Sequence, residues 1–222
     1  MKTTPGCEDR LFFPMLIRLA GRMCVVVGAG KIAATKIAGL LACGAPVTVI
    51  SPRAVPTIRQ RAAEEALIWR RRAFRPRDLE GAFLAVAATN SSRTNAAVFR
   101  ACAQRNVLCN SVDDPEHCDF IYPAVVRRGP LQIAISTGGR SPALAARLRR
   151  ELENQFSPEW AGWIEQLGKQ RAAVLARRLS ARARKRLLTQ AASASAFTAF
   201  LHGRSKAPQK PQKPKKPQQG LN

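Results

Sequence analysis

The stretch Met23-Cys-Val-Val-Val-Gly28-Ala-Gly30-Lys-Ile-Ala33 decides the fold of this chain. Five mostly β-favouring residues lead straight into Gly-x-Gly-x-x-Ala, and helix-forming residues follow. Gly28 permits a tight turn, Gly30 lets backbone N–H groups approach a pyrophosphate, and Ala33 lets the helix pack closely on the strand. The free N–H groups and positive dipole end of that helix favour phosphate. The stretch therefore predicts a dinucleotide-binding turn.

Strand-like and helix-like segments alternate along the first half of the chain. The pattern predicts strands at residues 23–27, 46–50, 66–71, 83–88 and 107–112, and helices at 31–42, 54–65 and 94–105. The run Thr89-Asn90-Ser91-Ser92 is typical of a helix N-cap. Such alternation predicts an α/β fold with a parallel sheet wrapped by helices, in which ligands bind at the carboxyl ends of the strands.

The pattern changes after Asp119. Two short strands, 120–126 and 131–136, are predicted on either side of a hairpin turn, Arg127-Arg128-Gly129-Pro130. A glycine loop follows, and Ser141 with Pro142 predicts the start of a helix over 143–156. A second helical stretch is expected from Pro158 to about residue 188, and a last short helix at 191–200. Residues 203–222 are mostly Pro, Lys and Gln, which predicts disorder.

The charge and cysteine content limit the classes of protein to consider. The net charge is +23, and no acidic residue follows Glu165. The six cysteines form no Cys-x-x-Cys pair and no zinc-like spacing. Apolar runs are short and the N-terminus is unlike a secretory signal, so we expect a cytoplasmic protein without a membrane span. The basic tail lacks the aromatic residues that stack on bases, which argues against nucleic acid.

Two further clusters indicate binding or chemistry. The strand at 46–50 ends in Ser51-Pro52-Arg53, without the carboxylate that commonly binds the NAD ribose, so the residues alone leave NAD and NADP open. Four acids fall within seven residues, namely Asp113, Asp114, Glu116 and Asp119. With His117 and Cys118 they offer donors that could hold Fe²⁺ transiently, although a solvated acidic loop explains most of them.

Three motifs in order carry a resemblance to a known family. They are the Gly28–Ala33 turn, the stretch from Asn110-Ser-Val-Asp113 to Tyr122-Pro-Ala124, and the stretch from Ala134-Ile-Ser-Thr-Gly-Gly-Arg140 to Ala145. Over residues 12–167 the chain resembles the precorrin-2 dehydrogenase/sirohydrochlorin ferrochelatase family. The resemblance implies an NAD-binding Rossmann domain at 1–115 and a dimerisation domain at 116–150. A basic helical region at 151–202 and a disordered tail at 203–222 would complete the chain.

The resemblance also implies an activity. It predicts a homodimer that oxidises precorrin-2 to sirohydrochlorin with NAD, as the family generally does without an acid at that strand end, and Fe²⁺ insertion is a possible second step. Asp113 falls on the family's catalytic aspartate. The expected cofactor contacts are Gly28, Ala29, Gly30, Lys31, Ile32, Ser51, Pro52, Arg53 and Thr89. No residue is assigned to a bound metal.

Substrate contacts are expected on the hairpin and the glycine loop. Precorrin-2 carries eight carboxylates, so its binding site needs arginine or lysine donors. The predicted contacts are Arg127, Arg128, Thr137, Gly138 and Arg140, although solvated turn charges would look the same in sequence.

An alternative from another class is a non-catalytic NAD-sensing module whose basic tail binds nucleic acid. Deleting Gly203–Asn222 separates the two, because an enzyme should keep its rate whereas a sensor should lose its output.

Overall fold

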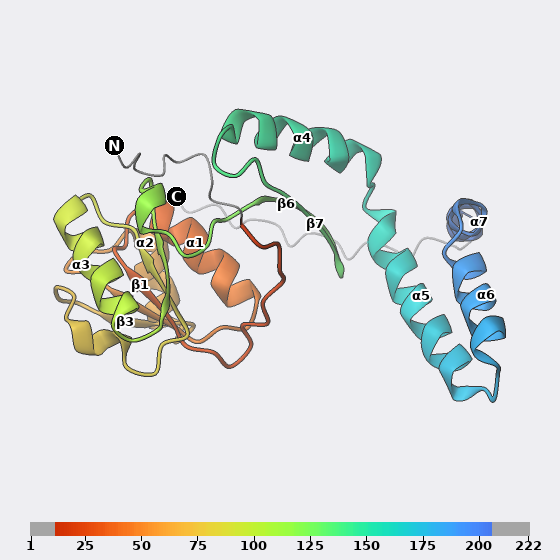
Figure 1. The fold of residues 1–222 in the computed structure, drawn as a ribbon, viewed down its shortest axis with the longest axis horizontal. Helices are drawn as coiled ribbons and strands as arrows, with labels where there is room; N and C mark the ends of the chain where they lie inside the picture. The colour runs from red at the N-terminus through yellow and green to blue at the C-terminus, as the bar shows by residue number, and fades with distance from the viewer. Residues whose placement is uncertain (1–11, 206–222) are drawn as a thin grey trace, which may run out of the picture. The chain divides into compact units, whose positions relative to one another are not determined.

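The computed structural model describes residues 12–205 (side chains to Gly203) and divides them into two compact units. Unit 1 contains residues 12–122 and 137–141, and unit 2 contains residues 123–136 and 142–205 (Figure 1). No helix in the described part of the chain has the length and apolar character needed to cross a membrane.

Unit 1 is built on a five-stranded parallel sheet in the order β3-β2-β1-β4-β5. Its strands are β1 Cys24–Val27, β2 Val47–Ile50, β3 Ile68–Arg70, β4 Leu84–Ala87 and β5 Leu108–Ser111. Its helices are α1 Lys31–Ala42, α2 Pro56–Ala63 and α3 Ser92–Ala103, with short 3-10 turns η2 Pro76–Leu79 and η3 Pro115–His117. The predicted α/β fold is confirmed, and the order reverses between β1 and β4.

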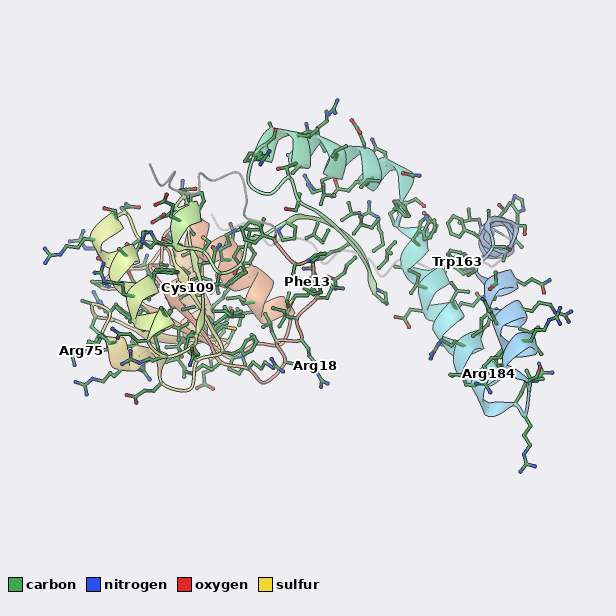
Figure 2. All side chains as sticks on the ribbon, viewed as in Figure 1. Phe13, Arg18, Arg75, Cys109, Trp163 and Arg184 are labelled. Atoms are coloured by element: carbon green, nitrogen blue, oxygen red, sulfur yellow. The ribbon has the colours of Figure 1, made fainter. Side chains whose placement is uncertain are left out.

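Alternate residues of each strand face opposite layers, which places a core on both faces of the sheet. Cys24 and Val26 of β1 pack with Ile37 of α1 and Ile58 of α2. Val25 and Val27 pack on the other face, in a cluster that includes Val98 and Cys102 of α3, Leu79 of η2 and Cys109 of β5, which is labelled in Figure 2. Every β1 side chain is buried, which explains why the sequence of this strand is an unbroken run of apolar residues.

A buried carboxylate ties β3 to η2. The Asp78 side chain is fully buried and accepts hydrogen bonds from Arg72 Nη1 (2.8 Å), Arg70 Nη1 (3.0 Å) and the Arg75 backbone N–H (2.8 Å). The bonds from Arg72 and Arg75 outweigh the effect of burial and lower the pKa of Asp78 from 3.8 to about 2. A pKa lowered by folding contributes stability that is lost as the pH falls towards the folded value.

We expect Asp78→Ala to lower the free energy of unfolding at pH 7 by about 2–3 kcal/mol, because two arginines lose their buried partner while staying partly solvated. The unaltered protein should lose stability between about pH 4 and pH 2, and the variant should lose less there. Urea unfolding at pH 7 and pH 3 checks both statements. Equal acid sensitivity of the two proteins would show that Asp78 contributes nothing to it.

Unit 2 begins with an antiparallel hairpin, β6 Ala124–Arg128 and β7 Leu131–Ile135. The predicted strand 120–126 is therefore wrong at both ends, and Arg127 and Arg128 lie in β6 rather than in the turn. Arg128 pairs with Leu131, which leaves Gly129-Pro130 as a two-residue turn. Gly129 has φ +58°, as the first position of a tight hairpin turn of this kind requires, and such turns suit the twist of paired strands.

Four helices follow, α4 Pro142–Gln155, α5 Glu159–Ala176, α6 Ala181–Ala191 and α7 Ala194–Ser205. The single helical stretch predicted from Pro158 to about residue 188 is wrong, because the helix ends at Ala176 and a new one starts at Ala181. Arg177 is extended (φ −84°, ψ 144°), and the Ser180 hydroxyl caps α6 by accepting from the Ala183 N–H at 3.3 Å. The break lets α6 pack against α5.

The last helix is also displaced from its predicted range. Where 191–200 was expected, α7 runs from Ala194 to Ser205, so Gly203 lies within a helix rather than opening a tail. The centre of the Phe197 ring on α7 lies 4.8 Å from the ring centre of Trp163 and 4.7 Å from that of Trp160. Both tryptophans are on α5, and Trp163 is labelled in Figure 2. This aromatic cluster joins α5 and α7. The rest of the predicted tail, 206–222, lies outside the described residues.

Candidate functional site

A pocket of about 720 Å³ opens at the carboxyl ends of β1, β2 and β4. This is where the strand order of the sheet reverses, the usual ligand position in an open α/β sheet. Of the predicted cofactor contacts, those that line it are Gly28, Ala29, Gly30, Ser51, Pro52, Arg53 and Thr89. Lys31 and Ile32 lie on the first turn of α1 with exposed side chains.

Gly28 makes the turn that leaves β1. Its φ is +106°, and its N–H donates to the Ile50 carbonyl at 2.9 Å. A Cβ at this position would stand 2.2 Å from the Ala88 backbone oxygen, which is closer than atoms can approach. Glycine is required here by both the backbone angle and the close approach of Ala88, the residue that follows β4.

Gly30 lines the pocket and immediately precedes α1. It caps the helix in an extended conformation, and no acidic side chain lies in the first turn. A Cβ on Gly30 would meet no atom within 4 Å, so free space lies over the helix N-terminus. Free N–H groups facing such space bind phosphate oxygens well. The residues therefore fit the pyrophosphate of a dinucleotide.

The rim after β2 is held in place by three hydrogen bonds. The Ser51 N–H donates to the Arg70 carbonyl (3.2 Å), the Trp69 indole donates to the Ser51 carbonyl (3.0 Å), and the Ser51 hydroxyl donates to the Arg53 carbonyl (2.7 Å). These hydrogen bonds hold the backbone of Ser51–Arg53 in a fixed conformation at one side of the pocket.

Thr89 leaves β4 on the opposite side of the pocket. The buried Asn95 of α3 fixes it, since Asn95 Oδ1 accepts from the Thr89 N–H (3.2 Å) and hydroxyl (2.7 Å). Asn95 Nδ2 donates back to the Thr89 carbonyl at 3.1 Å. The capping run around it behaves as predicted, because the Ser91 hydroxyl accepts from the Thr94 N–H.

Asp113 stands in the turn that follows β5. Its side chain is exposed, and its φ of +60° is uncommon for a residue other than glycine. Residues held in such a conformation concentrate at functional sites. The exposed carboxylate is thus held at the same edge of the sheet as the pocket, where parallel strands end.

Lys36 lies near Asp113, although sequence patterns gave no reason to select it. Its ammonium lies 3.9 Å from the centre of the Tyr122 ring, a cation–π contact. Burial lowers the pKa of Lys36, while the charge of Asp113 acts in the opposite direction. Among residues 12–205, no carboxylate oxygen lies within 4.0 Å of the Lys36 ammonium nitrogen, so no ion pair with Lys36 forms there. Lys36 therefore offers a positive charge close to Asp113.

Other members of the acidic cluster have local roles. Asp114 holds His117 through a 2.6 Å contact between Oδ2 and Nδ1, and the imidazole packs edge-on to Phe99. Asp119 Oδ2 accepts from the Cys109 N–H at 2.8 Å and so fixes the segment against β5. Within the part of the chain that the structure describes, no three metal-binding side chains come together.

The predicted substrate contacts fall in both units. In unit 2, Arg127 is exposed, whereas Arg128 donates to the Phe156 (2.6 Å) and Glu153 (2.9 Å) carbonyls at the end of α4. Arg128 thus stabilises the C-terminal end of α4. In unit 1, Thr137 shapes the glycine loop by accepting from the Ser141 N–H at 3.1 Å, next to Gly138 (φ +62°) and the exposed Arg140.

Known proteins share this arrangement. The family model described as "Putative NAD(P)-binding" matches residues 15–124, and "Sirohaem biosynthesis protein central" matches residues 128–155. The siroheme synthase of Methylobacillus flagellatus is 44% identical over 140 residues, which are 63% of this chain and 30% of that protein. That of Photorhabdus laumondii is 36% identical over 180 residues, which are 81% of this chain and 38% of that protein. The chain spans about a third of the length of these curated relatives.

A solved structure extends the likeness to the whole fold. SirC, a precorrin-2 dehydrogenase, is 28% identical with a TM-score of 0.73, and the match covers 88% of this chain and 100% of that one. Both units are therefore included in the similarity. The dinucleotide-binding turn and the central motif occur in the order that the sequence motifs predict. The chain belongs to the siroheme-biosynthesis family that includes siroheme synthase and precorrin-2 dehydrogenase.

Proposed function

We propose that this chain oxidises precorrin-2 to sirohydrochlorin with NAD as the electron acceptor. The observation that carries the proposal is the match to the precorrin-2 dehydrogenase SirC over the full length of that chain. A pocket suited to a dinucleotide, at the sheet edge where an exposed aspartate also follows β5, supports it. When bound, NAD supplies a nicotinamide ring that accepts one hydride.

The reaction removes two electrons and two protons from the macrocycle. One proton leaves with the electron pair as hydride, and the second must be taken by a base. Asp113 is the proposed base, because its carboxylate is exposed at the edge of the sheet where the pocket opens. The main contribution of the chain is to hold the macrocycle and the cofactor in contact.

Lys36 is the proposed positioning residue for Asp113. Its ammonium is fixed over the Tyr122 ring, which places a positive charge near the Asp113 carboxylate. Tyr122 is part of the same unit as Asp113 and Lys36.

The eight carboxylates of precorrin-2 call for cationic contacts. We propose that Arg127, Arg140 and the Thr137–Gly138 loop supply them, since both arginine residues are exposed. Arg128 donates to backbone carbonyls at the end of α4, so its proposed contact with the substrate would compete with these hydrogen bonds. Fe²⁺ insertion is a possible second reaction, with Asp113 accepting pyrrole protons as the metal enters.

We also infer a homodimer in the cytoplasm. Among the described residues the β6–β7 sheet contains two strands, and within the chain these strands pack against α4 and α5. Its outer backbone edges offer hydrogen-bonding groups to the same strands of a second copy. Light scattering after gel filtration should give twice the mass of the chain, and the mass of one chain would rule the dimer out.

The decisive experiment mixes the purified chain with enzymatically generated precorrin-2 and NAD in the absence of oxygen. We expect NADH absorbance and the sirohydrochlorin spectrum to rise together. Absence of turnover with either NAD or NADP would overturn the proposal. A second arm supplies sirohydrochlorin and Fe²⁺ without NAD, and a rate equal to the protein-free control would exclude chelation.

A further inference from the structure

One face of α6 carries a row of positive charges. Arg182, Lys185 and Arg186 are exposed, and their spacing of three and four residues places them on the same side of the helix. The opposite side contains the half-buried Ala183 and Leu187, and α6 packs against α5 (Figure 1). Arg182, Lys185 and Arg186 together are called the basic stripe below.

Acidic residues do not balance this stripe. None follows Glu165 in the sequence, and in the part of the chain that the structure describes no carboxylate forms an ion pair with the stripe. Helix α4 differs, because Arg147 pairs with Glu151 and Arg149 pairs with Glu153. Paired charges of that kind are typical of a solvated helix face. Solvation alone therefore does not account for the stripe.

The arrangement is unfavourable for the isolated chain. Like charges three or four residues apart on a helix repel each other. Arg182 also lies in the first turn of α6, where the positive end of the helix dipole disfavours a cation. Because bound negative charge would relieve both effects, the stripe favours a partner with closely spaced anionic groups.

The surroundings of the stripe indicate the kind of partner. Its side chains line neither the dinucleotide pocket nor the pocket between α5, α6 and α7, whereas small ligands bind in concave sites. Helix α6, which the structure describes in full, exposes no large apolar side chain. A protein interface usually has an apolar centre, and a membrane-bound helix inserts an apolar face. The partner is therefore expected to be an extended polyanion.

Double-stranded DNA has these properties. Its phosphates form a dense row of negative charge, and guanidinium groups offer planar donors that match phosphate oxygens. The major groove of B-form DNA admits an α-helix, whereas that of an RNA duplex is too narrow for side chains to read. Aromatic residues stack on the bases of single strands, so their scarcity in the basic C-terminal region does not exclude a duplex bound through its phosphates.

We propose that the basic stripe of α6 binds the phosphate backbone of double-stranded DNA without selecting a base sequence. The inference does not depend on the proposed function, because it concerns a different surface, in unit 2. It goes beyond that function in giving the chain a second ligand, one that takes no part in the oxidation of precorrin-2.

The test measures binding of the full chain to a fluorescent DNA duplex by anisotropy at several salt concentrations. The variant is Arg182→Gln/Lys185→Gln/Arg186→Gln. Its affinity at low salt should fall about tenfold or more, and the slope of log affinity against log salt should become shallower by about 3, one for each lost phosphate contact. Its melting temperature should not fall, because the variant removes like-charge repulsion from an exposed face.

Arg59→Gln/Arg77→Gln/Arg100→Gln is the matched control. It removes the same charge from three exposed residues of unit 1, so the affinity should stay within about twofold and the slope within about 0.5. Equal losses in the two triple variants would mean that total charge governs binding, which contradicts the inference. Unchanged affinity in the α6 variant also contradicts it, because the DNA contact would then lie elsewhere in the chain.

Two further arms replace the DNA by an RNA duplex of the same sequence and by vesicles that contain phosphatidylserine. Tighter binding to either than to DNA at the same salt concentration would reject DNA as the partner. Precorrin-2 turnover is measured separately on the unaltered chain. If the chain turns over precorrin-2 but does not bind DNA, the inference fails and the proposed function stands, and the reverse result has the opposite meaning.

Discussion

Turnover of precorrin-2 is expected to fall about 100-fold or more in Asp113→Asn, the usual scale for the loss of a catalytic acid or base. Asparagine is the informative replacement for structural reasons. Asp113 has φ +60°, a region in which asparagine is at least as well tolerated as aspartate, and its side chain is exposed. The variant should therefore keep its melting temperature and its affinity for NAD while losing the carboxylate. Anaerobic NADH formation at saturating NAD measures the loss.

Glu65→Gln is the matched control for that variant. Glu65 is also an exposed acid with positive φ, at +56°, but it lies after α2 and outside the pocket lining. Its replacement should leave turnover unchanged. Turnover near the unaltered rate in Asp113→Asn would show that the carboxylate is not the base, and a lowered melting temperature would assign it a structural role instead.

The parts of unit 1 that depend on local pattern were predictable from sequence. The β1–Gly28–α1 turn follows from residues adjacent in the chain, where apolar run, glycine and helix start occur together. The Ser91 cap was visible for the same reason. Alternation predicted a parallel sheet wrapped by helices, but it did not predict the strand order β3-β2-β1-β4-β5, because the same alternation is compatible with other orders.

Features that depend on distant residues could not be predicted. Lys36 contacts Tyr122 and lies near Asp113 only after the sheet has formed, and a lysine on a helix usually indicates a solvated face. Likewise Arg72 reads as one of many charges until Asp78 fixes it at the pocket wall. A capping serine at Ser180 was the available sign of the break between α5 and α6, but no glycine or proline marked the turn.

The second large effect is expected at the turn that shapes the pocket. Gly28→Ala should destabilise the chain by about 3 kcal/mol or more, since a strained backbone and an overpacked contact each cost about 1–3 kcal/mol. The added Cβ would stand 2.2 Å from the Ala88 oxygen, which is backbone and cannot rotate away, at a φ of +106°. Relief requires β1 and β4 to separate where the pocket forms. Chemical denaturation should therefore show a lower midpoint, and NAD binding should be lost with it.

Variants of two further glycines distinguish effects on folding from effects on dinucleotide binding. Gly39→Ala lies within α1, where a Cβ meets nothing within 4 Å, so it should be neutral or stabilising by up to about 1 kcal/mol.

Gly30→Ala also meets nothing within 4 Å and has φ −83°, so the chain should fold normally. Its methyl group would nonetheless occupy the space over the helix N-terminus that the pyrophosphate needs, and NAD affinity should fall about tenfold or more. Unchanged affinity in a folded Gly30→Ala variant would mean that the phosphates do not bind at this turn.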